Sequence, residues 1–242
     1  YGMDTEQQIA YLKENPEETI CPDDVEGDYF WCLYNELEAA GEKELSLKVL
    51  EMYCDASIQA QKASHDRIRP SFDAIYTYGM HLLGGKITPF KDIPLDIKKI
   101  FINFCILNTV VYTEDLDEFV DEYPQMLEFY KVLPQITYAD YDAVCPQLLR
   151  NVGLAYRDGT KVFEKNPGKA FEFFLTGARF DYDGRQIMWP FTRVAECAFE
   201  VATCFMKGIG VPKDLNAALE YFKFGAENSG LGAVPAMAEI YL

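Results

Sequence analysis

The sequence has few of the residues that metal sites and cofactor sites require. Histidine occurs only at His65 and His81, which argues against a histidine-ligated metal centre. The seven cysteines form no C-x-x-C pair and have no regular spacing. An odd number of cysteines without such a motif favours reduced thiols over a disulfide framework. We therefore expect no metal and no cofactor.

Basic residues are also scarce. Lysine and arginine number 22 against 39 aspartates and glutamates, which gives a formal net charge of −17. Such a charge argues against binding to nucleic acid or to an anionic membrane surface, and it favours a basic protein or peptide as partner. The longest apolar run, residues 100–112, is interrupted by Asn103 and Asn108 and is too short to span a bilayer.

No basic segment followed by an apolar stretch begins the sequence, so nothing at this end marks the protein for secretion. With the irregular cysteines, this predicts a cytoplasmic protein. Secretion stays open if a leader was removed ahead of Tyr1.

The acidic residues are concentrated before residue 145. Residues 1–69 hold 16 acids and 6 bases, and residues 113–144 hold 9 acids and 1 base, whereas residues 145–242 hold 11 of each. One interpretation is a surface that attracts a basic partner. The other is that the acids at 114–122 only keep a surface helix soluble, because apolar residues recur on the opposite face of that helix.

Three segments imitate active-site motifs without their geometry. The consecutive residues Ser64, His65 and Asp66 would point about 100° apart on a helix and could not align as a triad. Gly84 and Gly85 precede a lysine but lack the phosphate-loop spacing, and a helix stop explains them better. The acids at 114–122 lack the central glycine of a calcium loop. We predict that the protein is not an enzyme.

What the sequence does contain is an internal repeat. Residues 197–226 are a degenerate copy of residues 148–178, aligned 48 positions apart after one extra residue in the first loop. Repeats of this size are single structural units that stack to bury their apolar faces. Each copy predicts two antiparallel helices, the first ending at a glycine and the second beginning at Asn166 or Asp214, which are good N-caps. The positions expected to build the repeat are Gly159, Asn166, Ala170, Ala178, Gly208, Gly210, Asp214, Ala218, Tyr221 and Ala226.

The order of these residues resembles the Sel1-like repeat, a relative of the tetratricopeptide repeat. Residues 197–230 follow that pattern through the loop Gly208-Ile209-Gly210-Val211 and through Asp214, whereas residues 148–178 follow it with a loop insertion. Residues 233–242 resemble the first helix of a further repeat, either as a capping helix or as the start of a repeat that continues. The resemblance implies an all-α fold, an α-α superhelix of antiparallel helix pairs.

Before residue 145 the repeat pattern is less regular. We therefore divide the chain into a diverged, acidic helical part with tetratricopeptide-like helix pairs at 1–144 and Sel1-like repeats at 145–242. In the first part we expect a helical hairpin over 28–40 and 42–58, a helix ending near Gly85, a helix over 94–108 and another diverged pair within 114–133.

The resemblance implies a scaffold for protein–protein interaction that binds a partner peptide or protein on the surface of the helix pairs. The partner-binding candidates, placed by analogy with tetratricopeptide geometry or on an apolar loop, are Arg150, Arg157, Phe199, Glu200, Thr203 and Trp189. For each of them, simple packing or solvation is the alternative interpretation.

Two further functions stay open. Some Sel1-like proteins are linked to β-lactam binding or hydrolysis, but this chain lacks the disulfides of that branch and an S-x-x-K nucleophile. The diverged part could also be a separate ligand-binding or effector module, whose ligand its residues do not identify.

Overall fold

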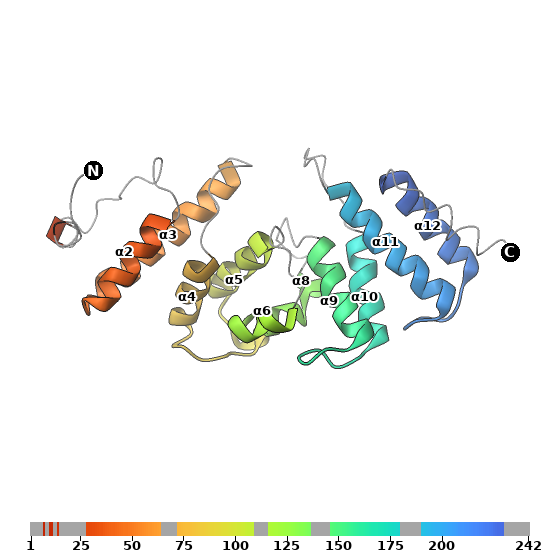
Figure 1. The fold of residues 1–242 in the computed structure, drawn as a ribbon, viewed down its shortest axis with the longest axis horizontal. Helices are drawn as coiled ribbons and strands as arrows, with labels where there is room; N and C mark the ends of the chain where they lie inside the picture. Colours follow the sequence, from red (N-terminus) through yellow and green to blue (C-terminus); the bar gives the residue numbers. More distant parts are fainter. Residues whose placement is uncertain are drawn as a thin grey trace. The chain divides into compact units, whose positions relative to one another are not determined.

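The computed structural model of the chain describes residues 28–63, 72–108, 116–136, 146–179 and 190–229, with Gln7, Ala10, Tyr11 and Glu14. The regular elements among these residues are helices and include no strand (Figure 1). The predicted all-α fold is confirmed. The chain divides into two compact units, residues 1–107 and 108–242, and each is described by itself.

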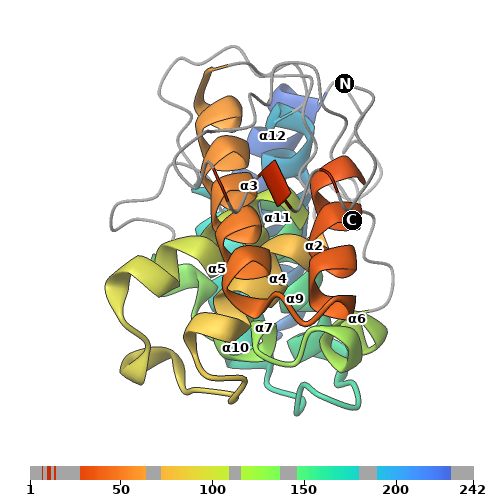
Figure 2. The ribbon, with the colours of Figure 1, turned by 90° about the vertical axis from the view of Figure 1, so that its left-hand side faces the viewer.

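Unit 1 begins with a helical hairpin of α2 (Asp28–Ala39) and α3 (Lys43–Ala63). The two helices pack side by side and lie in the foreground of Figure 2. Their buried side chains form one apolar cluster with a residue of the next helix, and its members are Leu33, Leu37, Val49, Leu50 and Ala74. The predicted hairpin is confirmed, with a second helix that extends five residues further than expected.

The next pair in unit 1 is α4 (Phe72–Leu82) and α5 (Leu95–Asn108), joined by a loop that contains the short 3-10 helix η2 (Phe90–Asp92). α4 ends at Gly84 and Gly85, both with positive φ, so these glycines do stop the helix. The ring of Phe101 on α5 packs directly against α4 at Gly79, because a Cβ added to this glycine would lie 2.6 Å from the ring. Only glycine at residue 79 leaves room for that ring.

Unit 2 opens with three short helices, α6 (Leu116–Glu122), α7 (Met126–Tyr130) and α8 (Leu133–Ile136). Two of them, α6 and α7, lie within 114–133, where we expected a diverged pair, and both are short. Pro124 and Pro134 account for their length, since proline lacks the amide hydrogen that would continue a helix. The segment is nevertheless part of the core, where Met126, Phe129 and Tyr130 are fully buried.

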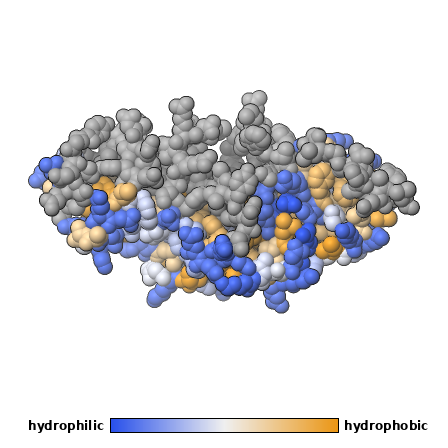
Figure 3. Space-filling view, in the orientation of Figure 1, coloured by the Kyte–Doolittle hydropathy of each residue, from blue (hydrophilic) through white to orange (hydrophobic). Residues whose placement is uncertain are grey.

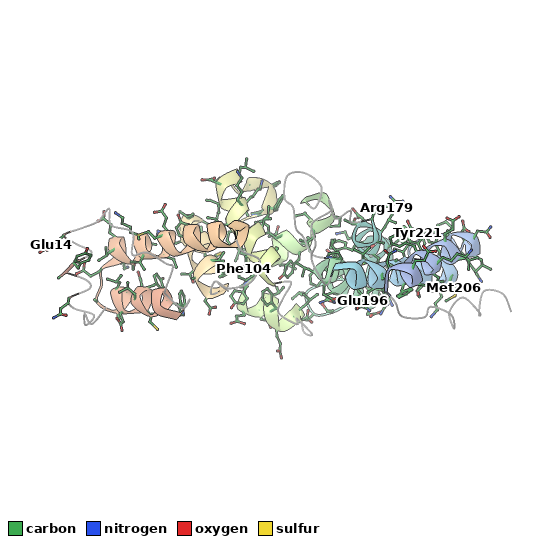
Figure 4. The ribbon with its side chains drawn as sticks, turned by 90° about the horizontal axis from the view of Figure 1, so that it is seen from above. Glu14, Phe104, Arg179, Glu196, Met206 and Tyr221 are labelled. Carbon is green, nitrogen blue, oxygen red and sulfur yellow. The ribbon has the colours of Figure 1, made fainter. Side chains whose placement is uncertain are left out.

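Two long helix pairs complete unit 2: α9 (Pro146–Asp158) with α10 (Pro167–Ala178), and α11 (Pro190–Lys207) with α12 (Leu215–Ser229). Each helix packs on the next along the chain, and α9 also packs on α11. α11 begins seven residues before the predicted start of the repeat at Cys197. In Figure 4, Glu196 and Met206 of α11 lie along one edge of unit 2, whereas Arg179 and Tyr221 lie toward the other. The first and second helices thus form two layers.

The local signals of the two repeats are confirmed. Gly159 and Gly208 have φ of 80° and 72°, the left-handed conformation that ends a helix at little cost for glycine. The Asn166 carboxamide oxygen accepts a hydrogen bond from the amide of Lys169, and the Asp214 carboxylate accepts from the amides of residues 216 and 217. These contacts pair amides that would otherwise lack partners at the helix start.

Small residues let the helices of each pair approach closely, as the repeat pattern predicts. Ala170 and Ala218 are fully buried and Ala178 is nearly so, whereas Ala226 and Tyr221 are half-buried. Elsewhere hydrophilic residues cover most of the coloured face in Figure 3, with smaller apolar patches between them. The apolar side chains of the pairs are thus largely turned toward each other.

Replacing Ala218 with leucine is expected to lower the free energy of unfolding by about 1–3 kcal/mol, because the larger side chain overpacks the contact with Ala202 and Phe222. Gly208→Val is expected to cost a similar amount through its positive φ. Urea denaturation of both variants measures the effect. The control is Lys223→Leu on the same helix, where the side chain is exposed and the change is expected to stay within about 0.5 kcal/mol. If both test variants are silent, Ala218 does not form a tight helix contact and Gly208 does not stop its helix.

Three predicted features lie outside the described residues: Trp189, the helix over 233–242, and the Ser64-His65-Asp66 segment.

Candidate functional site

The first helices of the two repeats are joined by an ion-pair cluster. Arg150 and Arg157, two turns apart on α9, both donate to Glu200 on α11, with N–O distances of 2.9 and 3.0 Å. Glu196, one turn before Glu200, lies 4.0 Å from the Arg150 Nε. The two carboxylate oxygens of Glu200 thus bind one arginine each, and the cluster ties α9 to α11.

The cluster is partly removed from solvent. The side chain of Glu200 is 14% exposed, and those of the two arginines are 27% and 29% exposed. Arg157 also forms two hydrogen bonds of 2.8 Å with the carboxylate of Asp158, which lowers the pKa of that carboxyl. Nearby, burial and then the charge of Glu200 raise the pKa of the Cys204 thiol to about 11, so this thiol is protonated at neutral pH.

The side chains of Phe199 and Thr203 make their contacts within the second repeat. A Cβ added to Gly225 on α12 would lie 2.5 Å from the ring of Phe199, so this ring fills the space that the glycine leaves. The hydroxyl of Thr203 donates to the carbonyl oxygen of Phe199, one turn earlier in α11. Of the five described candidates, three thus lie in the ion-pair cluster and two contribute to packing or to their own helix.

The acidic segment at 114–122 has a local role that the sequence did not reveal. The carboxylate of Asp117 on α6 accepts hydrogen bonds from the Thr160 hydroxyl at 2.7 Å and from the amides of Lys161 and Val162 at 2.9 and 3.4 Å. The ammonium of Lys161 lies 2.6 Å from the carboxylate of Asp121. These contacts hold the inserted loop of the first repeat against α6.

The Asp117 contact is expected to make stability depend on pH. Partial desolvation raises the pKa of this carboxyl, but the hydrogen bonds from the loop outweigh it, so the pKa lies below its ordinary value. The stabilisation is therefore present above the unfolded pKa of about 3.9 and is lost as pH falls through the lower folded value. Asp117→Asn is expected to lower the melting temperature at pH 7 and to have little further effect at pH 2.5. An equal loss at both pH values would contradict this role.

A second feature of interest is an open groove in unit 1. It has a volume of about 560 Å³ and lies between α2 and α4. Its lining residues are Tyr34, Tyr76, Thr77, Met80, His81, Gly84 and Gly85. The groove could not be predicted from the sequence, because its walls come from two helices whose sequences show no shared motif.

The geometry of the two helix pairs in unit 2 agrees with a comparison to known families. The family model described as Sel1 repeat matches residues 146–179 and 195–229, which cover α9 with α10 and most of α11 with α12. The chain therefore contains two Sel1 repeats, at residues 146–179 and 195–229. The resemblance predicted from the glycine, alanine and aromatic spacing is confirmed.

Other comparisons add little to the assignment. The crystal structure of a Sel1 repeat protein from Oxalobacter formigenes is similar over 98% of this chain and 90% of that one, with 18% sequence identity and a TM-score of 0.35. A TM-score this low supports no conclusion, so the assignment rests on the two repeats that the family model matches. No curated protein matches the chain significantly.

The Sel1 repeats also contact each other through their loops. Gly210, in the loop of the second repeat, has φ of 71°, and a Cβ added there would lie 2.0 Å from the carbonyl oxygen of Pro167. Pro167 is the first residue of α10 in the preceding repeat. Further along, the ring of Phe171 packs edge-on against Phe205 at 5.2 Å between centroids. The second repeat therefore touches the first through its loop and its first helix.

The described residues contain no group of three or more histidine, cysteine or carboxylate side chains that could hold a metal ion. No helix in the described part of the chain is long and apolar enough to cross a membrane.

Proposed function

We propose that this protein is an interaction scaffold that binds a partner protein or peptide along the surface of its helix pairs. The observation that carries the proposal is the way the two repeats are held together. The ion-pair cluster joins their first helices, and the Gly210 loop joins the second repeat to the start of α10. A surface held at several points loses little conformational freedom when a partner binds.

The side formed by the first helices is the part of unit 2 that we propose for the partner. Arg150, Arg157 and Glu200 already bind one another, so a partner would meet this cluster as a preformed charged surface rather than as separate side chains. Glu196, with a side chain 35% exposed, lies at its edge. We propose a basic partner. The net charge of −17 supports this for the chain as a whole, and on unit 2 the acidic group offered to the partner is Glu196, since residues 145–242 hold 11 acids and 11 bases.

We also propose that the protein works in a reducing, cytoplasmic compartment. The described residues include Cys32, Cys54, Cys105, Cys197 and Cys204, and within the described part of the chain these five form no disulfide. Four of the five thiols are buried, which favours packing over pairing.

Affinity capture from the source cell, followed by reconstitution with purified components, tests the scaffold. We expect a stoichiometric complex with a basic protein, and we expect higher salt to weaken it. Glu196→Lys on the first-helix side is expected to raise the Kd at least about threefold through like-charge repulsion. Glu227→Lys on α12, which makes the same charge change on the second-helix side, is the control. Absence of any stoichiometric protein partner, or turnover of a chromogenic β-lactam by the purified chain, would contradict the scaffold.

A further inference from the structure

The groove of unit 1 occupies a position that is closed in unit 2. In each unit two helix pairs follow one another, so α2 and α4 are first helices of successive pairs, as α9 and α11 are. In unit 2 the ion-pair cluster of Glu200 with two arginines closes the seam between the first helices. In unit 1 the corresponding seam carries a groove of about 560 Å³.

Two tyrosines from different helices line this groove, and the ring of each packs against other aromatic rings. Tyr34 on α2 stacks on Trp31, with 5.1 Å between ring centroids and an interplanar angle of 16°. Tyr76 on α4 contacts the rings of Phe101 and Phe104 on α5, with centroid distances of 6.0 and 5.9 Å. The rings are therefore packed before any ligand arrives, which lowers the entropic cost of binding.

Acidic residues outnumber basic ones on the helices that line the groove. α2 carries Glu36 and Glu38 and α4 carries Asp73, and the one basic residue of the two helices is His81 in the last turn of α4, which lines the groove. Glu38 lies one turn after Tyr34, outside the lining itself, and one of its carboxylate oxygens accepts a hydrogen bond from the hydroxyl of Ser46 on α3. Its negative charge adds to burial in raising the pKa of the Tyr34 phenol. A carboxylate close to an aromatic wall is a combination that favours a cation.

Uncharged groups complete the lining. Thr77 and Met80 lie on the same face of α4, and Gly84 and Gly85 end it without side chains. Methionine adapts to the shape of an aliphatic chain. The groove can thus accept the methylene stem of a long side chain together with its charged end.

We propose that this groove binds an arginine side chain of a partner peptide, with the guanidinium against the tyrosine rings and near Glu38. This inference rests on the proposed scaffold function. It adds the site at which the partner binds and the kind of side chain that the partner places there. Arginine fits better than lysine, because its planar guanidinium stacks on aromatic rings and is weakly hydrated. In the seam of unit 2, arginines of the chain itself already bind Glu200.

Fluorescence anisotropy with two labelled peptide pools tests the proposal. Both pools are random nine-residue peptides, one with arginine fixed at the centre and the other with citrulline, which has nearly the same shape but no charge. We expect the arginine pool to bind at least about fivefold tighter at low salt. Free arginine and tetramethylammonium are expected to compete only at millimolar concentration, since the site takes a side chain within a peptide. Equal binding of both pools, or tight competition by either small cation, would overturn the proposal.

Two variants in or near the groove and one control variant test the position of the site. Thr77→Arg places a tethered guanidinium in the groove and is expected to weaken binding of the arginine pool at least about tenfold. Asn216→Arg adds the same charge at an exposed position of α12 and is expected to leave the Kd within about twofold. Glu38→Gln, which removes the charge and keeps the shape, is expected to weaken binding about threefold. Circular dichroism melting checks that all three variants fold.

The outcome separates this inference from the scaffold function. If the Thr77→Arg variant binds the arginine pool with the same Kd as the unmodified chain, the groove is not the binding site. A stoichiometric complex with the natural partner would still support the scaffold in that case. If the chain forms no such complex, the scaffold itself fails.

Discussion

Gly210→Ala is expected to destabilise unit 2 by about 3 kcal/mol or more, the largest effect of an alanine substitution among the described glycines. Two causes add. The residue has φ of 71°, which an alanine adopts only with strain, and the new Cβ would lie 2.0 Å from the Pro167 oxygen and 2.4 Å from its carbonyl carbon. Both contacts are with backbone atoms, which cannot rotate away. The loop and the start of α10 would have to separate.

Gly208→Ala is the matched control for this prediction. Gly208 has nearly the same φ, 72°, but a Cβ added there would have its nearest neighbour at 3.7 Å. Its substitution is expected to cost only the strain of the left-handed conformation, about 1 kcal/mol. Urea denaturation compares the two variants. Equal losses would mean that the loop of the second repeat does not press against Pro167 in solution.

Glu200→Ala is expected to destabilise unit 2 by about 2–3 kcal/mol. The substitution leaves Arg150 and Arg157, both more than two-thirds buried, without the carboxylate that pairs them. Removing one member of a partly buried ion pair costs more than the pair contributes, because the remaining charges keep their desolvation penalty. The free energy of unfolding at low salt measures this loss.

Glu196→Ala, one turn earlier on the same helix, serves as its control. This carboxylate lies 4.0 Å from Arg150 and its side chain is 35% exposed, so its removal is expected to cost less than about 0.5 kcal/mol. If the two substitutions prove equivalent, the Glu200 cluster does not join α9 to α11.

The sequence predicted the local features of the repeats well. The glycine stops at Gly159 and Gly208 and the caps at Asn166 and Asp214 follow from the preferences of single residues, which neighbouring sequence is enough to show. The helix pairs follow from apolar spacing for the same reason. In the segment between residues 116 and 136, two prolines keep the helices short, and a third helix, α8, follows the two expected ones.

The contacts between helix pairs could not be predicted from the sequence. Arg150 and Glu200 are 50 residues apart and stand at non-equivalent positions of the two repeats, so the repeat alignment gives no sign that they meet. The loop glycine Gly210 was predicted, but its contact with Pro167 was not. The groove of unit 1 depends on how far apart two helices lie, which side-chain packing determines and no single motif encodes.

The central claim is that the two Sel1 repeats of unit 2 are stacked and unfold together as one surface. Hydrogen exchange of the Gly210→Ala variant tests it most directly, because the substitution lies in the second repeat and the clash is with the first. We expect faster amide exchange in α9 and α10 as well as in α11 and α12. Faster exchange confined to α11 and α12, with α9 and α10 protected as in the unmodified chain, would contradict the claim.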